Sequence, residues 1–360
     1  MSFRKKTAIK SHLVNLNDYQ IIKEINRGAY GIIYLIQDNK NGRKFAAKVN
    51  LQADDSVSNE LKLISREVGI LMRVESPTII RFFGFSLDDF DGNPNVTILM
   101  DYYQNGSLHQ LISQKRKGTS PPEFDNTAKQ IILCGIAHGM MTLHSHRILH
   151  RDLKPDNVLL DSDYHPYLTD FGISKFLDPN NSKSQSMAGC GTAAYISPEV
   201  IDDIHYSMKA DVFSFGILMF EIITEEIPFS EFFPKKKANS FQIQNLIATG
   251  KRPTFKTPIK PVFKKLIERC WSHNPRERPT FREIFHKLSL SPEDDDETIE
   301  SSLQDLISNG NDTDQIEYLL DDVDKNKLLD YVYEITNEDT TKDEEFQHLL
   351  EEQTKLIQSL

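Results

Sequence analysis

The chain contains the stretch His150-Arg151-Asp152-Leu153-Lys154-Pro155-Asp156-Asn157, and Asp170-Phe171-Gly172 begins thirteen residues after Asn157. This spacing places a candidate base, a cation that can bind phosphate and two oxygen ligands for a metal ion within about twenty residues. A polar surface loop is the alternative interpretation of the same residues. The rest of the chain argues against that alternative, because it supplies further parts of one site in a consistent order.

The stretch resembles the catalytic loop and the metal-binding segment of eukaryotic protein kinases. The resemblance implies that Asp152 orients the substrate hydroxyl or accepts its proton, and that Lys154 stabilises charge on the γ-phosphoryl group of ATP. It also implies that Asn157 and Asp170 bind Mg²⁺, with Mn²⁺ as an alternative. Because an Asp in water has a pKa of about 4, we expect Asp152 to act by positioning and late proton acceptance.

Residues 19–50 alternate apolar and polar positions between turn signals, which predicts antiparallel strands. Residues 26–33 resemble the glycine-rich loop of kinases, in which Gly28 and Gly31 let backbone amides approach the phosphates of ATP. Asn26 replaces the first glycine of that loop. Since Asn tolerates positive φ, we expect the turn to survive the replacement.

Two charged residues follow the glycine-rich loop at the spacing found in kinases. Lys48 ends the segment Phe45-Ala46-Ala47-Lys48, which resembles the third-strand lysine motif, and is expected to bind the α- and β-phosphates. Glu67 lies in a segment whose apolar positions have helical spacing, and is expected to pair with Lys48. A single Lys or Glu is usually a solvated surface charge, but the order of Gly31, Lys48 and Glu67 favours a paired site.

Residues 96–103 read as a buried strand with a polar exit, and they resemble the last strand of the small lobe and the hinge, whose backbone groups hold adenine. We expect Ile33 and Ala46 to cover one face of the adenine ring. Met100 is expected to be the gatekeeper residue, and packing in the core is an equally compatible role for it. The predicted nucleotide-binding set is Gly28, Gly31, Ile33, Ala46, Lys48, Met100, Asp101 and Tyr103.

In the second lobe, residues 125–146 carry apolar positions at helical spacing, which predicts a helix that leads to His150. Asp211 opens a strongly apolar helix, and by resemblance it holds the backbone amides of the catalytic loop. Residues 191–199 resemble the end of the kinase activation segment, with Ser197 in place of the usual Ala. Glu199 is expected to form a structural salt bridge with Arg278.

The segment between Gly172 and Glu199 is rich in Ser, Asn and Gly, which predicts a mobile loop. Arg151 is a feature of kinases whose activation loop is ordered by phosphate. Thr192 also matches the position that hydrogen-bonds the catalytic Asp and Lys in Ser/Thr kinases. The candidate phosphate acceptors are Ser182, Ser184, Ser186 and Thr192, with a flexible polar linker as the alternative for the serines; Cys190 is expected to be a passive small residue.

The pattern Cys270-Trp271…Pro275…Arg278-Pro279-Thr280-Phe281 resembles the tyrosine-kinase and tyrosine-kinase-like groups. Lys154 and Thr192 then favour the tyrosine-kinase-like group of Ser/Thr kinases, with dual specificity as an alternative. A pseudokinase that acts as a scaffold is a second alternative. Pseudokinases typically lack one of the residues that match Lys48, Asp152, Asn157 or Asp170, and all four are present here.

Composition limits the class of protein. The chain has 360 residues, of which 39% are hydrophobic, and contains no run of about eighteen apolar residues, so no membrane span is expected. Three scattered cysteines and the lack of an apolar segment after the basic start favour an intracellular, cytoplasmic location, with the nucleus as an alternative. No basic stripe with interleaved aromatic residues is present, so nucleic acid is not an expected partner.

Charge is distributed unevenly along the chain. Residues 291–360 hold 22 Asp and Glu against 4 Lys and no Arg, a net charge of −18, which leaves residues 1–290 at +7. Apolar residues recur at helical spacing in this tail, so short amphipathic helices are expected around residues 303–307, 316–323, 328–335 and 346–357. One expectation is that the acidic tail folds against the basic body and restrains it as a regulatory contact, with a solubilising tail or one that binds a regulatory partner as the alternative.

These observations predict an α+β fold, the bilobal protein kinase fold. Its β-rich N-lobe with one main helix is expected over residues 19–101, and its mainly α-helical C-lobe over residues 104–290, after an N-terminal extension of residues 1–18. Residues 291–360 form the acidic, helical or partly disordered tail. The predicted function is transfer of the γ-phosphate of ATP to Ser or Thr hydroxyls of protein substrates.

Overall fold

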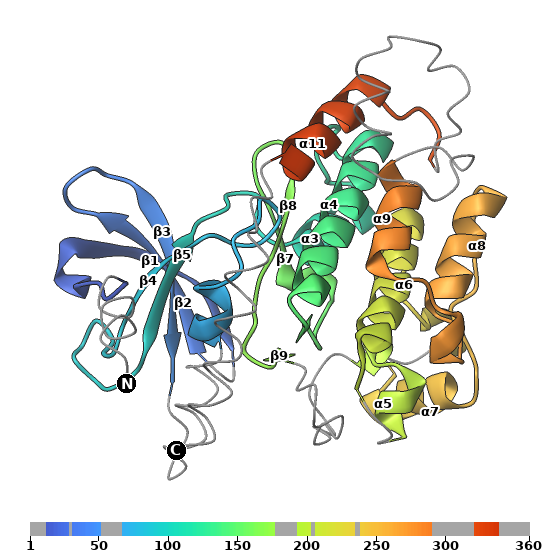
Figure 1. The fold of residues 1–360 in the computed structure, drawn as a ribbon, viewed down its shortest axis with the longest axis horizontal. Coiled ribbons are helices and arrows are strands. Elements are labelled where there is room, and N and C mark those ends of the chain that lie inside the picture. Colours follow the sequence, from blue (N-terminus) through green and yellow to red (C-terminus); the bar gives the residue numbers. More distant parts are fainter. Residues whose placement is uncertain are drawn as a thin grey trace. The chain divides into compact units, whose positions relative to one another are not determined.

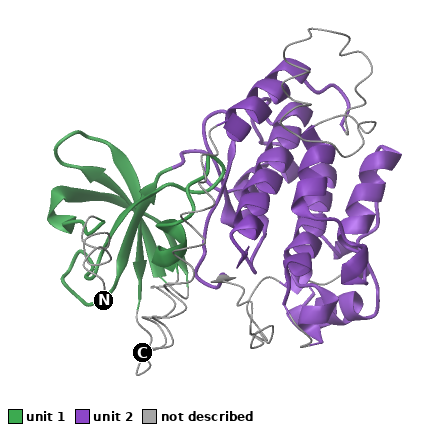
Figure 2. Cartoon of the chain, in the orientation of Figure 1, with its two compact units in different colours: residues 1–102, 338–360 green, residues 103–337 purple. Residues whose placement is uncertain are grey.

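The computed structural model describes residues 12–28, 31–51, 67–176, 193–202, 206–234, 238–289 and 320–337. These residues fall into two units, one within residues 12–102 and one within residues 103–337, coloured separately in Figure 2. The first unit is built on β-strands and the second mainly on helices (Figure 1). The α+β class and the kinase-type division into a strand-rich part and a helical part are confirmed.

The first unit holds one antiparallel sheet with the strand order β1-β2-β3-β5-β4. Its strands are β1 (Tyr19–Gly28), β2 (Gly31–Asp38), β3 (Lys44–Asn50), β4 (Phe82–Ser86) and β5 (Thr97–Asp101), preceded by the short 3₁₀ helix η1 (Leu16–Asp18). The strands predicted over residues 19–50 and within residues 96–103 are confirmed. Of the predicted helix around Glu67, residues 67–71 are helical, and the preceding residues lie outside the described part of the chain.

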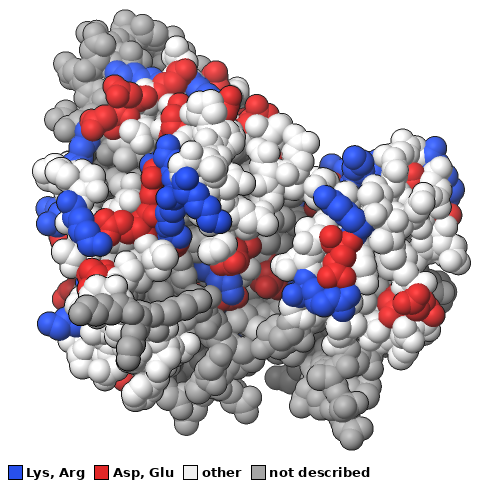
Figure 3. Space-filling model, turned by 180° about the vertical axis from the view of Figure 1, so that it is seen from behind, with Lys and Arg blue, Asp and Glu red and all other residues white. Residues whose placement is uncertain are grey.

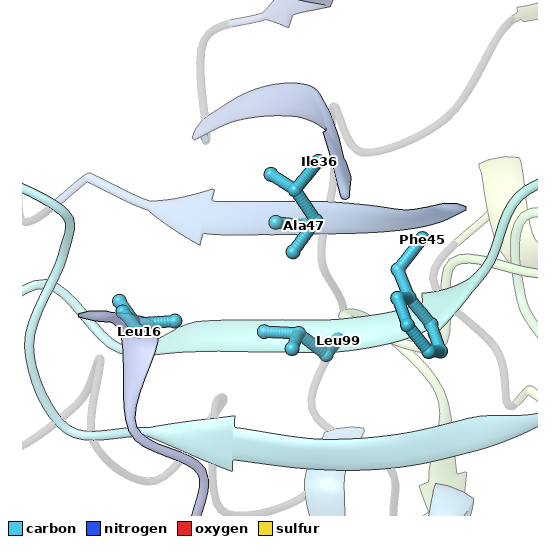
Figure 4. Close-up of a cluster of buried hydrophobic side chains, with 5 residues drawn as sticks. All are labelled: Leu16, Ile36, Phe45, Ala47 and Leu99. Atoms are coloured by element: carbon cyan, nitrogen blue, oxygen red, sulfur yellow. The ribbon is translucent and has the colours of Figure 1, made fainter. Parts of the chain in front are cut away.

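One face of this sheet packs on an apolar cluster of Leu16, Ile36, Phe45, Ala47 and Leu99 (Figure 4). Because successive side chains of a strand point to opposite faces, Ala46 and Lys48 lie on the face opposite Phe45 and Ala47. The sheet register pairs Ala46 with Met100 and Lys48 with Ile33. The packed core therefore sends these four side chains to one shared face of the sheet.

The second unit is a group of helices around two that are buried almost on all sides, α4 (Asn126–Ser145) and α6 (Met208–Thr224). Both start at a capping residue: the Asp125 carboxylate accepts the N–H of Ala128 at 2.9 Å, and the Ser207 hydroxyl accepts the N–H of Lys209 at 3.3 Å. The other described α-helices before the tail are α3 (Leu108–Arg116), α5 (Pro198–Ile201), α7 (Ser240–Ala248), α8 (Pro261–Cys270) and α9 (Phe281–Ser289). The helix predicted over residues 125–146 is confirmed.

Two small antiparallel ribbons cross the second unit. β6 (Ile148–Leu149) pairs with β9 (Lys175–Phe176), and β7 (Val158–Leu160) pairs with β8 (Pro166–Leu168). The 3₁₀ helices of this unit are η2 (Pro155–Asn157), η3 (Ala193–Tyr195), η4 (Ser230–Phe232) and η5 (Pro275–Glu277). The ribbons set the positions of the residues that flank them, and these include most of the predicted site.

The described part of the tail contains helix α11 (Lys325–Asn337), which packs on α4 and α9 (Figure 1). This confirms the helix expected from the spacing of Leu328, Leu329, Val332 and Ile335. The tail helices predicted around residues 303–307 and 346–357 lie outside the described residues. Of the helix predicted over residues 316–323, the described residues 320–323 form a bend and a turn, so this part of the prediction is wrong. Among the described helices, none combines the length and the apolar character needed to cross a membrane.

Candidate active site

Lys48 and Glu67 form a close ion pair in the first unit. The Lys48 Nζ lies 2.8 Å from the Glu67 Oε1, and the two side chains are only 15% and 5% exposed. Two charges this far removed from water need each other, since either one alone would carry a large desolvation cost. The pairing holds the Lys48 ammonium group at a defined place on the sheet face that also carries Ile33, Ala46 and Met100.

Ala46 and Met100 are both buried, and they face each other across the β3–β5 pair. The carboxylate of the next residue, Asp101, accepts a hydrogen bond from Arg43 Nη2 at 2.7 Å, and its N–H donates to the Arg81 carbonyl at 3.1 Å. Asp101 is thus held by its side chain as well as by its backbone. Tyr103 belongs to the second unit, where its ring stacks on Tyr167 at 4.1 Å.

The two glycines of the β1–β2 hairpin have different surroundings. A Cβ atom on Gly31 would collide with the backbone carbonyl of Val49, so this glycine is required by the close approach of β2 to β3. A Cβ atom on Gly28 would meet no atom of the described residues within 4 Å. Packing against β3 therefore explains Gly31, whereas packing among the described residues does not require a glycine at position 28.

Asn26 corrects one expectation. It lies in β1 opposite Ile33 and does not have positive φ, so its tolerance of that conformation has no part in the turn. An extended residue at this position needs no special backbone freedom. The replacement of the first glycine is accommodated because residue 26 is still within the strand.

Asp152, Lys154 and Asn157 converge in the second unit. The Lys154 Nζ donates to the Asp152 Oδ2 at 2.6 Å, and the Asn157 Nδ2 donates to the same oxygen at 2.9 Å and to the Asp152 carbonyl at 2.8 Å. These bonds lock the orientation of the carboxylate. They also use the side-chain amide nitrogen of Asn157. The side-chain oxygen of Asn157, Oδ1, is therefore the atom that can act as a metal ligand.

The β7–β8 ribbon brings Asn157 next to the segment of Asp170. Asn157 directly precedes β7 and Thr169 directly follows β8, and the Thr169 N–H donates to the Asn157 carbonyl at 3.1 Å. Asp170 comes next and has a φ of 63°, a left-handed conformation that is uncommon for a residue other than glycine. One tight ribbon thus brings together Asn157 and Asp170, which are thirteen residues apart in the sequence.

Asn157 offers its side-chain amide oxygen and Asp170 offers its carboxylate oxygens. Both are ligands that a hard cation such as Mg²⁺ prefers. No group of three or more His, Cys, Asp and Glu side chains in the described residues could hold a metal ion by itself. Such a sparse set suits a cation that keeps water and phosphate oxygens as its remaining ligands. The residues therefore fit a cation bound together with a nucleotide.

Asp211 supports the backbone of the loop that carries Asp152. It is fully buried, and its two oxygens accept the N–H of His150 at 3.0 Å, the N–H of Arg151 at 2.9 Å and the Tyr206 hydroxyl at 3.1 Å. Burial raises the pKa of Asp211, but the hydrogen bond with His144 Nε2 at 2.9 Å and the backbone bonds outweigh burial and lower that pKa. Asp211 is thus a carboxylate that supports the backbone of the loop.

His144 and Tyr206 were absent from the sequence-based site. His144 stands near the end of α4 and Tyr206 shortly before α6, and nothing in their spacing from Asp211 marks them as its partners. The predicted role of Asp211 could have prompted a search for side chains that satisfy its remaining oxygen capacity. Such a search could have found Tyr206, which lies five residues before Asp211, but not His144, which reaches Asp211 only through the tertiary fold.

The His150 ring is completely buried, and burial lowers its pKa below the ordinary value of 6.5. Its neutral Nδ1 accepts the Asp152 N–H at 3.3 Å. The Phe171 ring, also fully buried, lies 5.5 Å from the His150 ring. The hydroxyl of Ser174 donates to the His150 carbonyl at 3.0 Å. His150 therefore joins the loop of Asp152 to the segment that follows Asp170.

Glu199 and Arg278 form a buried, two-pronged ion pair. The Arg278 Nη1 and Nη2 lie 2.6 Å and 2.8 Å from the two carboxylate oxygens of Glu199, and the guanidinium group is fully buried. Next to it, the Ser197 hydroxyl is buried with no hydrogen-bond partner among the described residues. The candidate regulatory residues Ser182, Ser184, Ser186 and Thr192, and Cys190, lie outside the described residues.

The protein kinase domain family matches residues 19–288, and the chain belongs to this family. The match covers three-quarters of the chain, and it includes both units that carry the candidate residues. Protein kinase domains in general use ATP and a divalent cation and act on protein substrates. The family predicted from the catalytic loop is confirmed.

Several relatives are named as protein kinases. The chain is 32% identical over 280 residues to a probable serine/threonine-protein kinase of Dictyostelium discoideum, a match over 77% of this chain and 20% of that protein. It is 35% identical over 280 residues to serine/threonine-protein kinase 12 of Arabidopsis thaliana, over 75% and 56% of the two chains. A dual specificity protein kinase of D. discoideum is 30% identical over 74% of this chain and 39% of its own length. The shared region is thus only part of each relative.

Proposed function

We propose that the chain is an ATP-dependent protein kinase that phosphorylates Ser and Thr residues of proteins. The observation that carries the proposal is the convergence of Lys154 and Asn157 on one oxygen of Asp152, with Asn157 bonded to the neighbour of Asp170. A phosphoryl-transfer site needs a positioned carboxylate, a cation and metal-binding oxygens, and little other chemistry from the protein. The names of the relatives agree with this function.

In this proposal Asp152 orients the substrate hydroxyl and takes its proton late in the reaction. Lys154, 2.6 Å from the Asp152 carboxylate, stabilises the charge that develops on the transferred group. Asn157 and Asp170 hold the divalent cation, proposed to be Mg²⁺ with Mn²⁺ as the alternative, and nucleotide phosphates and water would supply its remaining ligands. When bound, the cation neutralises charge on the β- and γ-phosphates.

Residues of the first unit are proposed to bind the nucleotide. Lys48, held by Glu67, binds the α- and β-phosphates, and Gly28, which has no Cβ atom, lets the backbone approach them. Ile33, Ala46 and Met100 are proposed to contact adenine, because they share a face of the sheet with Lys48. Backbone groups of residues 101–103 complete adenine binding in the proposal.

We further propose membership of the tyrosine-kinase-like group. The support is the Cys270-Trp271 to Phe281 pattern, whose tryptophan ring contacts the rings of Phe220 and Phe255 at 5.9 Å and 5.6 Å. The kinase domain is proposed to span residues 19–290, after an extension of residues 1–18 and before the acidic tail of residues 291–360. A cytoplasmic location is proposed because ATP is abundant there and because Cys134 and Cys270 are both free thiols.

Regulation is proposed to act through the activation segment. Arg151, whose guanidinium group lies 5.1 Å from the Tyr206 ring centroid, would receive a phosphate placed on Ser182, Ser184, Ser186 or Thr192. The tail is proposed to make an intramolecular regulatory contact, and the packing of α11 on α4 supports this.

The proposal is tested by phosphate transfer from labelled ATP to Ser, Thr and Tyr peptides in the presence of Mg²⁺. Asp152→Asn should lower the rate by about a hundredfold or more, because general-base and positioning contributions are of this size. Asp156→Asn is the matched control, since Asp156 is an exposed carboxylate in the same loop.

Different outcomes separate the alternatives. Incorporation into all three peptides indicates dual specificity, as in the D. discoideum relative named for it. Nucleotide binding without incorporation indicates a pseudokinase. If Asp152→Asn leaves the transfer rate unchanged, the assignment of Asp152 is wrong.

A further inference from the structure

Helix α11 lies well beyond the end of the family match at residue 288, yet it packs as closely as a core element. The side chains of Leu328, Val332 and Ile335 are at most 1% exposed, and Tyr331 is 4% exposed. Figure 1 shows the helix lying along α4. Burial of four large side chains from one face is what fixes a helix on its neighbour.

The surface under α11 is shaped for Tyr331. A Cβ atom on Gly135 of α4 would collide with the Tyr331 hydroxyl and would lie 2.5 Å from Pro166 Cγ. A helix interior disfavours glycine by roughly 1 kcal/mol relative to alanine, so the gap at Gly135 has a cost that its occupants offset. Tyr331 and Pro166 thus meet over the same glycine.

Polar contacts anchor the start of the tail helix to the start of α4. The Asn126 Nδ2 donates to the Asp321 carbonyl at 3.0 Å, and the Asp324 N–H donates to the Thr127 hydroxyl at 2.9 Å. An exposed ion pair between Lys260 and Asp321, at 3.2 Å, adds to these. The apolar face and these bonds together set both the position and the rotation of α11.

Charge attraction is a minor part of this contact. Asp321 is 76% exposed, and exposed ion pairs contribute little to stability. On the face seen in Figure 3, acidic and basic side chains are interspersed on the second unit, with no broad area of one sign. The contact of α11 is therefore mainly apolar, unlike the charge-driven contact expected from the sequence.

Tyr331 also contacts the turn of the β7–β8 ribbon. Its ring stacks on His165 at 4.5 Å with an angle of 25° between the planes. His165 is itself fixed: its N–H donates to the Asp161 Oδ1 at 2.9 Å, and its carbonyl accepts the Asp161 N–H at 3.2 Å. Pro166, the other neighbour of Tyr331, is the first residue of β8.

This ribbon is the element that joins Asn157 to Asp170. β8 runs from Pro166 to Leu168, and the next residue, Thr169, donates its N–H to the Asn157 carbonyl. A displacement of Pro166 is therefore passed along three residues of strand to the Asn157–Thr169 bond. Few ordered residues separate Tyr331 from the cation ligands assigned above.

We propose that α11 is a positioning element of the kinase unit, and that Tyr331 acts through His165 and Pro166 to hold the β7–β8 ribbon so that Asn157 and Asp170 keep their cation-binding geometry. The proposal rests on the assignment of these two residues as cation ligands under Proposed function. It makes the tail helix part of the active enzyme. Residues that support metal ligands commonly alter metal affinity by about tenfold or more when changed.

The test compares Tyr331→Ala with Tyr333→Ala in the full chain. Tyr333 is the matched control because it is the same residue type on the same helix but is 50% exposed. The first measurement is amide hydrogen exchange of peptides covering residues 157–170. The second measurement is thermal unfolding in the presence of saturating ADP at increasing Mg²⁺ concentrations. It gives the Mg²⁺ concentration at which half of the full rise in unfolding temperature is reached.

Tyr331→Ala should accelerate exchange in residues 157–170 by about tenfold and raise the half-maximal Mg²⁺ concentration by about tenfold. It should lower kcat and leave the KM for peptide substrate unchanged. Tyr333→Ala should change none of these quantities. If Tyr331→Ala only lowers the unfolding temperature, with exchange in the ribbon and Mg²⁺ dependence unchanged, the helix merely stabilises the fold and the proposal is overturned.

Two further variants guard against simple misfolding. Tyr331→Phe keeps the ring on His165 and should retain the Mg²⁺ dependence of the unaltered chain. Gly135→Ala should reproduce the effect of Tyr331→Ala from the α4 side, and Tyr331→Phe should partly rescue it by removing the colliding hydroxyl. Absence of that rescue together with unchanged exchange in the ribbon also overturns the proposal.

Asp170→Asn tests the underlying assignment separately. If this variant leaves the Mg²⁺ dependence unaltered, the assignment of the cation ligands fails, whatever the tail does. If Asp170→Asn weakens the Mg²⁺ response and Tyr331→Ala does not, the cation site stands and the role of α11 is rejected.

Discussion

Asp211 and Asp152 are two carboxylates that serve the same loop in different surroundings. Asp211 is fully buried and accepts hydrogen bonds from two backbone N–H groups, His144 and Tyr206. Asp152 keeps 13% of its side chain exposed, and its Oδ2 accepts hydrogen bonds from Lys154 and Asn157. The first contacts groups that hold the fold, and the second contacts groups that suit phosphoryl transfer.

The difference shows that two different carboxylates support the backbone of this loop and serve its proposed chemistry. A carboxylate saturated by protein donors has no capacity left for a substrate, so its function is to fix the backbone. A carboxylate oriented through one oxygen by a lysine and an amide can still receive a hydroxyl. The following predictions challenge this division, starting with the largest expected effect.

Asp211→Ala should lower the free energy of unfolding by about 3–5 kcal/mol, because it leaves several buried donors without an acceptor. Asp211→Asn should cost less, since its amide oxygen still accepts hydrogen bonds. Urea denaturation measures both values. An Asp211→Ala variant as stable as the unaltered chain would contradict the supporting role.

Asp152→Asn should instead affect activity and leave stability nearly unchanged. The rate of phosphate transfer should fall by about a hundredfold, while the free energy of unfolding changes by less than about 1 kcal/mol. The amide oxygen still accepts from Asn157, which keeps the loop in place. Transfer assays and urea denaturation on the same preparation check the pair of values. A large loss of stability would place Asp152 with Asp211 instead.

His150 predicts a dependence of stability on pH. Burial lowers its pKa in the folded chain below the ordinary value of 6.5, so below that pH the unfolded chain binds a proton that the folded chain does not. Stability should therefore be full above the ordinary pKa and should decline as the pH falls below it. His150→Phe should make this decline shallower in urea titrations at several pH values, and an equally steep decline would reject the assignment.

Tyr331→Phe should have the smallest effect. The Tyr331 hydroxyl is buried with no hydrogen-bond partner among the described residues, in contrast to the saturated Asp211. Its removal should raise the free energy of unfolding by up to about 1 kcal/mol, since no bond is lost and desolvation is relieved. Thermal or urea unfolding measures the change. A loss of stability would reveal a hydrogen bond at this hydroxyl.

Much of the fold could be predicted because local patterns carry it. Alternation over residues 19–50 predicted the strands of the sheet, and the apolar spacing of residues 125–146 predicted α4 within one residue at each end. The expectation for Asn26 was wrong in its reason, because the end of β1 depends on pairing with β2. Strand pairing is a contact between segments, and a single segment does not encode where it stops.

The candidate site likewise contains residues that the local sequence predicts and residues that it does not. Asp152, Lys154 and Asn157 lie within six residues, so their meeting follows from one short loop. His144 reaches Asp211 from α4, whereas Tyr206 lies just before α6, which contains Asp211; neither partner was predicted from the sequence. The tail shows the limit most clearly, because its charge predicted an electrostatic contact, whereas the described helix is held mainly by buried apolar side chains.

The amino-acid sequence alone determined the family, the strand-rich first part followed by a mainly helical second part, and the residue types of the candidate site, because these depend on short spacing and local preference. Only the tertiary structure decided which partners saturate Asp211, why Gly135 is a glycine, and where α11 packs. Those features arise from contacts between residues far apart in the chain, such as Gly135 with Tyr331. Their energies come from close packing and desolvation, which depend on three-dimensional neighbours.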